Sequence, residues 1–221
     1  MSIQTVGIIG AGTMGNGIAQ ACAVSGIPVV MVDISEAAVA KGIATVSGSL
    51  DRLVKKEKIT EADKAKALGL IKGSTSYDDL KATQLVIEAA TENQDLKVKI
   101  LKQLDGMLPA DVIIASNTSS ISITQLAAAT QRADRFIGMH FFNPVPMMAL
   151  VEIIRGLQTS DATHDAVHAL ATALGKTPIT VKNAPGFVVN RILVPMINEA
   201  LFVLAEGLAT AEDIDAGMKL G

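Results

Sequence analysis

The sequence has 221 residues, of which 49% are hydrophobic and 19% are charged, and its net charge is −3. This length is enough for one large hydrophobic core and a second, smaller unit. An acidic balance with one tyrosine and no tryptophan argues against a nucleic-acid partner. No window reaches the ~18 apolar residues of a membrane span, and the first expected strand begins too early to leave room for a signal peptide. The single cysteine, Cys22, is expected to be a buried helix residue and not a nucleophile, and its isolation favours the cytoplasm.

A glycine-rich turn follows the first expected strand, an apolar run over residues 6–9. The turn reads GAGTMG and leads into a helix of small residues over 17–24. In this pattern Gly10 permits the tight turn, Gly12 lets the backbone approach a pyrophosphate, and Gly15 lets the helix pack close to the strand. The helix N-terminus offers N–H groups to phosphates. The pattern therefore predicts a dinucleotide site.

The second expected strand, over residues 28–32, ends on an acidic residue. Asp33 lies ~20 residues beyond the glycine-rich turn, where a carboxylate can accept a hydrogen bond from a ribose 2′-hydroxyl. Strand, glycine-rich turn, helix, strand and acid follow one another in the order that this fold requires. The sequence thus predicts a nicotinamide or flavin nucleotide as the cofactor.

A pair of helices is expected to follow Asp33. Ser35 can cap a helix whose apolar residues recur at helical spacing, and Thr60-Glu61-Ala62-Asp63 resembles a capping box at the start of a second helix. The far end of the first helix is basic, with Arg52, Lys55, Lys56 and Lys58. Composition leaves two interpretations open: a solvated helical hairpin, or an arm that offers cations to a multiply phosphorylated ligand.

Polar residues recur at the ends of the next expected strands, over residues 85–89, 112–116 and 136–139. In an open parallel sheet, ligands bind beyond the carboxyl ends of the strands. Asp33 and four later residues are predicted at such ends: Glu92, Asn117, Ser119 and His140. We therefore expect these side chains to form one site.

A carboxylate lies inside a later apolar strand, over residues 150–154. Glu152 needs a partner there, because an unpaired buried charge is costly, and His140 is the natural candidate. A helix over 161–174 and a strand over 178–181 follow. His164 and His168 lie four residues apart on that helix, but the zinc-protease pattern is missing, so a solvated helix face is expected there and no metal site.

The turn Asn183-Ala184-Pro185-Gly186 is the best candidate for a domain boundary. It divides the chain into a nucleotide-binding domain, 1–182, and a helical unit, 183–221. A long apolar helix is expected over 187–206, with Pro195 inside it as a potential kink, and another helix over 211–219. We expect one stripe of the long helix, including the Asn190 side, to dock on the nucleotide domain and the rest to need a partner surface.

Several segments together resemble one family. They are the glycine fingerprint with Met14, VIEAATEN, IIASNTSSI, GMHFFNPVPMMALVEII, APGFVVNRIL and EDIDAGMKLG. The sequence resembles the 3-hydroxyacyl-CoA dehydrogenases over its whole length, most of all the short bacterial 3-hydroxybutyryl-CoA type. The resemblance implies a Rossmann-type α/β fold with a mostly parallel, doubly wound sheet, a helical arm and an all-α C-terminal domain. It also implies reversible oxidation of (S)-3-hydroxyacyl-CoA by NAD, and a homodimer formed through the C-terminal helices.

The resemblance also assigns roles to residues. It implies that His140 is the general acid/base, that Glu152 orients it, and that Ser119 and Asn190 hold the thioester and the reacting oxygen. The expected cofactor contacts are Gly10, Gly12, Thr13, Met14, Gly15, Asp33, Glu92, Lys97, Ser119 and Asn143. The expected substrate contacts are Ser49, Lys56, Ser119 and Asn190, so that the basic arm meets CoA.

Two other functions fit parts of the same pattern. A β-hydroxyacid dehydrogenase acting on free acids would share the fold but is expected to use a catalytic lysine. A non-catalytic NAD-binding protein would keep the fold without the activity. The presence of Ser119, His140, Glu152 and Asn190 together argues against this alternative. The family continues past MKLG with further helices and another cofactor-contacting lysine, so the helical domain is expected to be incomplete in this sequence. No enoyl-CoA hydratase region is present.

Overall fold

The computed structural model describes residues 3–221 and contains one eight-stranded sheet. The strand order is β3-β2-β1-β4-β5-β6-β7-β8, and every neighbouring pair is parallel except β6 and β7. The strands are β1 Val6–Ile9, β2 Val29–Val32, β3 Ile71–Ser74, β4 Leu85–Glu88, β5 Ile113–Ser116, β6 Phe136–Phe141, β7 Leu150–Arg155 and β8 Thr177–Lys182. The order of the first six strands is that of the dinucleotide-binding fold, which confirms the predicted fold class.

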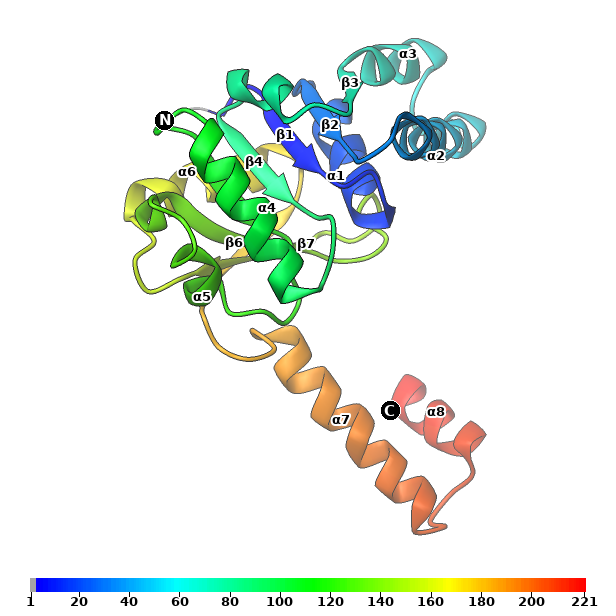
Figure 1. Cartoon of the computed structure of the whole chain (residues 1–221). Helices are drawn as coiled ribbons and strands as arrows, with labels where there is room; N and C mark the ends of the chain where they lie inside the picture. The colour runs from blue at the N-terminus through cyan, green and yellow to red at the C-terminus, as the bar shows by residue number, and fades with distance from the viewer. Residues whose placement is uncertain (1–2) are drawn as a thin grey trace.

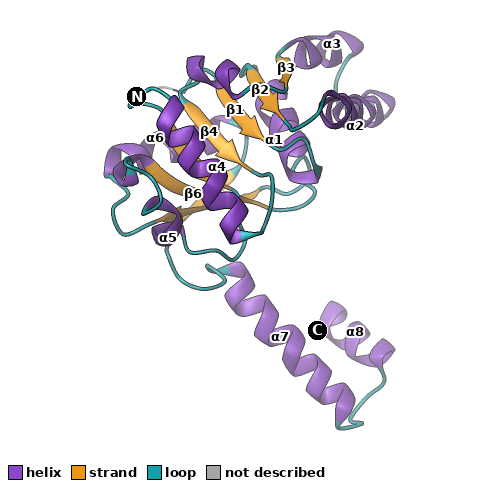
Figure 2. Cartoon of the chain, in the orientation of Figure 1, coloured by secondary structure: helices purple, strands orange, loops and turns teal. Residues whose placement is uncertain are grey.

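Eight α-helices are assigned within the described residues (Figures 1 and 2). They are α1 Thr13–Val24, α2 Glu36–Lys55, α3 Glu61–Gly69, α4 Gln94–Met107, α5 Ile123–Ala127, α6 Asp161–Ala173, α7 Val189–Ala205 and α8 Ala211–Leu220. Short 3₁₀ turns cover Tyr77–Ala82 and Ala133–Arg135. The helix over 161–174 and all the strands except β3 were predicted to within one or two residues of their observed bounds.

The helices cover both faces of the sheet, because successive strand residues point to opposite sides. Ile8 of β1 belongs to one core cluster, which also contains Ile18 of α1 and Val167 of α6. Ile9 belongs to the other cluster, which also contains Leu101 of α4. Each strand therefore needs apolar residues on both faces, which explains why the strands read as continuous apolar runs in the sequence.

The strand β3, at the edge of the sheet, was not predicted from the sequence. Its residues are Ile-Lys-Gly-Ser, which are weakly apolar and include a glycine. Gly73 is required by packing, because a Cβ at this position would lie 2.3 Å from the Cγ1 of Val39 on α2. The backbone of β3 pairs with β2, and the missing side chain at Gly73 leaves room for Val39 of α2. The strand therefore forms without an apolar sequence pattern.

The arm, α2 and α3, begins as its capping residues predict. The hydroxyl of Ser35 accepts a hydrogen bond from the N–H of Ala38, and Thr60 and Asp63 form a reciprocal capping box. The buried face of α2 carries Val39, Val46 and Leu50. Figure 1 shows the two helices side by side at one end of the sheet, beyond β3.

The long apolar helix departs from its predicted position. We expected one stripe of it to dock on the nucleotide domain, but no residue of α7 is buried. Figure 1 shows α7 extending away from the sheet, with α8 folded back beside it. The helix continues through Pro195 without interruption. No helix of residues 3–221 is long and apolar enough to cross a membrane.

Candidate active site

The glycine-rich turn adopts the conformation that a dinucleotide fingerprint requires. Gly10 has a φ of 99°, and a Cβ there would lie 2.7 Å from the carbonyl oxygen of Ala89. At Gly15, a Cβ would lie 1.7 Å from the carbonyl oxygen of Gly10, so the helix can approach the strand only because this side chain is absent. A Cβ at Gly12 would meet open space, which leaves the backbone at the start of α1 accessible to a phosphate.

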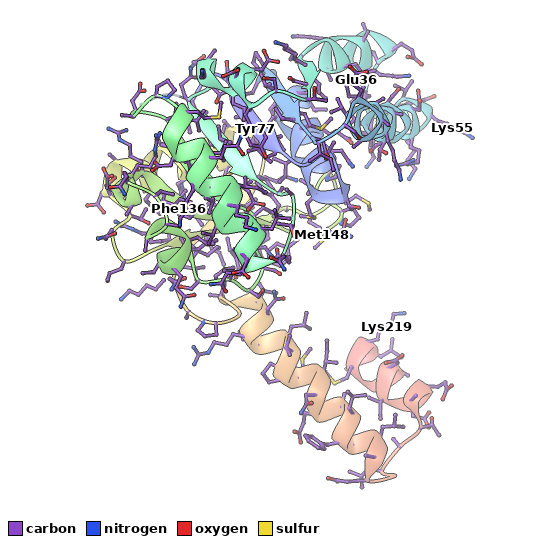
Figure 3. The ribbon with its side chains drawn as sticks, in the orientation of Figure 1. Glu36, Lys55, Tyr77, Phe136, Met148 and Lys219 are labelled. Atoms are coloured by element: carbon purple, nitrogen blue, oxygen red, sulfur yellow. The ribbon has the colours of Figure 1, made fainter. Side chains whose placement is uncertain are left out.

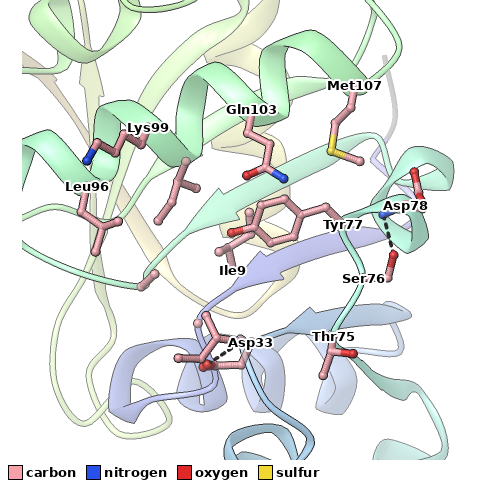
Figure 4. A pocket seen from close by; sticks show the side chains of 14 residues that line it. Ile9, Asp33, Thr75, Ser76, Tyr77, Asp78, Leu96, Lys99, Gln103 and Met107 are labelled. Atoms are coloured by element: carbon pink, nitrogen blue, oxygen red, sulfur yellow. Dashed lines mark hydrogen bonds between the residues drawn. The ribbon is translucent and has the colours of Figure 1, made fainter.

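Asp33 lies directly beside this turn. Its Oδ2 accepts a hydrogen bond from the N–H of Ala11 at 2.6 Å, and its Oδ1 accepts one from the N–H of Ile34 at 2.7 Å. The carboxylate is half-buried at the edge of a cavity of about 820 Å³ (Figure 4). Its position suits the recognition of a ribose hydroxyl next to the fingerprint.

Apart from Gly10 and Asp33, the residues that line this cavity were not predicted as site residues from the sequence. Figure 4 shows Tyr77 near its centre, with Gln103 and Met107 of α4 on one side and Asp33 on another. Tyr77 is half-buried, and burial raises the pKa of its phenol. The only sequence feature that could have indicated this pocket is Tyr77, the single tyrosine of the chain. The local sequence pattern does not mark the α4 residues as pocket lining.

A buried ion pair lies below the loop after β4. The ammonium of Lys97 bonds the carboxylate of Glu88, and both side chains are almost completely inaccessible to solvent. Glu88 also accepts hydrogen bonds from the hydroxyl of Ser116 at 3.0 Å and from the N–H of Ala90 at 3.0 Å. Lys97, a residue expected to contact NAD, is therefore engaged with Glu88 in this structure, where it supports the loop that carries Glu92.

Glu92 and Ser119 come together although they are far apart in sequence. Glu92 accepts a hydrogen bond from the hydroxyl of Thr118 at 2.7 Å and one from the N–H of Ser119 at 3.2 Å. Nearby, Asn117 accepts a hydrogen bond from the N–H of Phe141 at 2.9 Å, which ties the end of β5 to the end of β6. Glu92, Asn117 and Ser119 of the predicted cluster therefore lie together at the carboxyl ends of these strands, whereas Asp33 lines the separate cavity around Tyr77.

His140 lies inside β6, whereas the sequence predicted that the strand would end at residue 139 and that His140 would follow it. The strand extends to Phe141 because it pairs with the antiparallel β7, and in this register His140 stands directly opposite Glu152. The Nδ1 atom of His140 lies 2.7 Å from Oε2 of Glu152. The carboxylate is fully buried and the imidazole nearly so. In a dry surrounding such a hydrogen bond is strong, and it directs the Nδ1 proton to the carboxylate.

The loop between β6 and β7 carries Asn143, and it is held in place by packing against α1 and by hydrogen bonds from Lys176. Val145 occupies the space that Gly17 leaves on α1, since a Cβ at Gly17 would lie 2.9 Å from that of Val145. Lys176 donates hydrogen bonds to the carbonyl oxygens of Val145 and Met148, at 2.5 and 2.8 Å. Burial lowers the pKa of Lys176. Asn143 itself is exposed, between the catalytic strand and the fingerprint helix.

A second cavity, of about 520 Å³, lies where the nucleotide domain meets α7. It is lined by Ser119, Ser120, Pro185, Gly186, Asn190, Arg191, Val194 and Pro195. Ser119 and Asn190 therefore share one cavity, as their predicted roles require. Ser49 and Lys56 lie elsewhere, on the arm, which leaves the domain in another direction from α7 (Figure 1).

Two further predictions concern groups outside these cavities. The thiol of Cys22 is buried, and burial raises its pKa to about 12, so it stays protonated at neutral pH. His164 contacts the carboxylate of Asp165 at 2.9 Å and the hydroxyl of Thr180 at 2.8 Å. Among the described residues, no group of three or more histidine, cysteine or acidic side chains is arranged to hold a metal ion.

Comparison with known proteins assigns the fold and the site to one family. The family model for the 3-hydroxyacyl-CoA dehydrogenase NAD-binding domain matches residues 5–184, and that for the C-terminal domain of the same enzymes matches residues 186–221. The chain belongs to the 3-hydroxyacyl-CoA dehydrogenase family. Family membership explains why a nucleotide-binding fold and a helical C-terminal unit occur together.

Individual relatives agree with this assignment. A 3-hydroxybutyryl-CoA dehydrogenase of Bradyrhizobium diazoefficiens is 52% identical over 99% of the chain and 75% of its own length. The mitochondrial hydroxyacyl-coenzyme A dehydrogenase of Mus musculus is 46% identical over 99% of the chain and 72% of its own length. The crystal structure of (S)-3-hydroxybutyryl-CoA dehydrogenase from Ralstonia eutropha superimposes with a TM-score of 0.98 at 80% identity, covering 100% of this chain and 78% of that one.

Proposed function

We propose that this 3-hydroxyacyl-CoA dehydrogenase interconverts short-chain (S)-3-hydroxyacyl-CoA, namely 3-hydroxybutyryl-CoA, and the 3-oxoacyl-CoA, with NAD as the redox partner. The observation that carries the proposal is the buried pair of His140 on β6 and Glu152 on β7, next to the turn whose Gly186 lines the cavity of Ser119 and Asn190. The relatives named above, which are 3-hydroxybutyryl-CoA dehydrogenases or a hydroxyacyl-CoA dehydrogenase, support the choice of substrate.

The residues at the fingerprint fit NAD. Gly12 leaves open space for a pyrophosphate, and Asp33 offers a carboxylate for a ribose hydroxyl beside a large cavity. NAD held there would supply the acceptor for the hydride that leaves the hydroxyl-bearing carbon of the substrate. The residues that we assign to cofactor binding are Gly10, Gly12, Thr13, Met14, Gly15, Asp33, Glu92, Lys97, Ser119 and Asn143.

His140 is the general acid/base in this mechanism. Because Nδ1 donates its hydrogen bond to Glu152, Nε2 is left as the acceptor for the proton of the substrate hydroxyl. The buried carboxylate stabilises the imidazolium that results. In the reductive direction the same imidazolium returns the proton to the developing alkoxide.

Ser119 and Asn190 assist at the reacting oxygen. Both line the cavity next to α7, and both carry uncharged donors that can stabilise developing negative charge without being reorganised during the reaction. Glu92 fixes the N–H of Ser119 and so fixes the backbone from which the serine hydroxyl projects. These residues hold the substrate, and His140 moves the proton.

The arm and the C-terminal unit complete the proposal. Lys56 is exposed at the end of α2, with Ser49 two turns before it, and both are assigned to the CoA moiety. We place the domain boundary at 182/183, where β8 ends. The apolar residues exposed on α7 support a homodimer formed through the C-terminal helices. The single, free and buried cysteine is compatible with a cytoplasmic protein.

The test compares acetoacetyl-CoA with free acetoacetate as oxidants of NADH, followed by the loss of NADH absorbance. We expect turnover with the thioester and at least ~100-fold lower kcat/KM with the free acid, because the arm then has no nucleotide to bind. Equal rates would instead indicate a β-hydroxyacid dehydrogenase. NADH binding without turnover of either compound would indicate a non-catalytic member of the fold.

A further inference from the structure

The turn that joins β8 to α7 passes directly over the catalytic pair in a strained conformation. Gly186 and Phe187 have φ angles of 73° and 53°, so two successive residues adopt the left-handed conformation. Glycine adopts it freely, but a bulky aromatic residue does so rarely, and its neighbours must then hold it in place. Phe187 is one of two residues other than glycine with a positive φ among those described.

The ring of Phe187 is placed against the imidazole of His140. Its centroid lies 5.7 Å from that of the imidazole, and the two planes are inclined by 59°. A second ring, that of Phe142, lies 4.5 Å from the imidazole at 50°. Phe187 is buried. Two aromatic side chains therefore limit how far the imidazole can tilt about its bond to Glu152.

The carboxylate of Glu152 holds the same turn from the other side. Its Oε2 contacts His140, and its Oε1 accepts hydrogen bonds from the N–H groups of Val188 and Val189, each at 3.0 Å. These N–H groups belong to the start of α7, and no side chain from the helix's own N-cap position caps them. Helix N-termini bind carboxylates well, so Glu152 from β7 serves as the cap.

We propose that Phe187 is a positioning residue for His140, and that Glu152 fixes it by binding the N-terminus of α7. A residue whose only role is to fill the core does not need an unfavourable backbone conformation. Phe187 has a positive φ, and in this conformation its ring contacts the imidazole of His140. The turn thus keeps Nε2 of His140 directed at the substrate oxygen. This inference rests on the proposed role of His140 as the acid/base.

Two variants of Phe187 test the ring and the backbone separately. Phe187→Leu keeps apolar volume and removes the aromatic ring, while Phe187→Gly makes the positive φ favourable and also removes the ring. Leu157→Ala is the control, because Leu157 is 86% exposed on the nucleotide domain and belongs neither to the active site nor to the apolar surface of α7. The readouts are kcat and KM with acetoacetyl-CoA, NADH binding, and the low-field proton NMR signal of the His140 Nδ1–H bonded to Glu152.

We expect both Phe187 variants to lose ~10- to 100-fold in kcat, with NADH binding and KM within ~3-fold of the native protein, because small displacements of a catalytic group have effects of this size. The low-field signal should shift or broaden in both Phe187 variants and stay unchanged in Leu157→Ala. A Phe187→Gly protein with native kcat would overturn the proposal, as would parallel losses of kcat and NADH binding in Phe187→Leu. The NMR signal is read without turnover: a native signal in both variants rejects the inference even if acetoacetyl-CoA is not the substrate.

Discussion

At the scale of single residues, the carboxylate of Glu152 joins two parts of the molecule. It is fully buried, and its two oxygens face different partners, the imidazole of His140 on one side and two N–H donors of α7 on the other. A carboxylate satisfies both sides because both of its oxygens accept hydrogen bonds. A neutral amide cannot, because one of its ends is a donor.

This asymmetry makes Glu152→Gln a test of the His140 tautomer. The amide oxygen must face the N–H groups of Val188 and Val189, so its NH₂ group must face Nδ1 of His140. Nδ1 then becomes the acceptor, and the proton moves to Nε2, where the base is needed. We expect kcat for oxidation of 3-hydroxybutyryl-CoA to fall by ~10³-fold or more, by the reasoning that applies to the catalytic triad of serine proteases.

The control for this variant is Glu36→Gln, which removes an exposed carboxylate at the start of α2. It should keep native kinetics. NADH binding should survive in Glu152→Gln, because the fingerprint is built from other elements. A Glu152→Gln protein that keeps more than a tenth of the native kcat would contradict the assigned tautomer.

We expect Asp33 to determine the preference for NAD over NADP. Its carboxylate would repel a 2′-phosphate, and the three residues that follow it, Ile34, Ser35 and Glu36, supply no cation. We expect kcat/KM to be at least ~10-fold higher with NADH than with NADPH. Asp33→Asn should narrow this ratio, since the amide can still accept a hydrogen bond from the N–H of Ala11 but has no charge. A preference for NADPH in the native protein would show that other residues control the choice.

At the scale of elements, we expect the arm, α2 and α3, to contribute to the binding only of substrates that carry phosphates. Lys56 lies just beyond the end of α2 and is exposed. We expect Lys56→Glu to raise KM for acetoacetyl-CoA by ~10-fold, because a cation that pairs with phosphate is replaced by an anion. KM for acetoacetyl-pantetheine, which lacks the nucleotide, should stay native.

Lys41→Glu is the matched control on the same helix. Lys41 is also exposed, and it lies 15 residues from Lys56, or ~22 Å along a helix axis. Its substitution should leave both KM values unchanged. If Lys56→Glu changes KM for both substrates equally, the arm does not bind the nucleotide part of CoA.

The elements also show which parts of the fold the sequence could specify. The fingerprint, the end of β2 and the capping residues Ser35 and Thr60 are local signals, and the structure follows them. The pairing of His140 with Glu152 was predictable because a buried carboxylate needs a partner. The extension of β6 to Phe141 was not, since it depends on the antiparallel register with β7. The pocket around Tyr77 was missed because segments far apart in the sequence form it, namely 9–10, 33–34, 75–78, 90 and 96–107. Only the first two of these segments carry a local pattern.

At the scale of the whole molecule, the two units bury their apolar residues to very different extents. The sheet and its helices enclose two continuous cores, whereas α7 has no buried residue. Figure 3 shows side chains standing out from α7 with only α8 beside them. The exposed apolar residues of α7 include Ile192, Val194, Met196, Ile197, Leu201, Phe202 and Leu204. An apolar surface of this kind marks an interface.

The sequence had suggested that α7 would dock on the nucleotide domain, and the structure shows why it does not. Glu152 binds the first N–H groups of the helix, and the buried Phe187 anchors the preceding turn, so the helix is held by its N-terminus alone. Its axis then leads away from the sheet (Figure 1). The apolar pattern predicted that the helix needs a partner, but the direction of its axis depends on contacts across the sheet.

We therefore expect the 221-residue protein to self-associate through α7. Each apolar side chain of this size that leaves water contributes ~1.5–3 kcal/mol, so pairing of two copies along the helix is strongly favoured over solvation. Ile197→Glu, near the middle of the exposed stripe, should shift the protein toward the monomer in multi-angle light scattering. Leu157→Glu is the control, because Leu157 is equally apolar and 86% exposed but lies on the nucleotide domain. A native protein that is monomeric at 100 μM would show that α7 tolerates solvent, and a Leu157→Glu effect equal to that of Ile197→Glu would place the interface elsewhere.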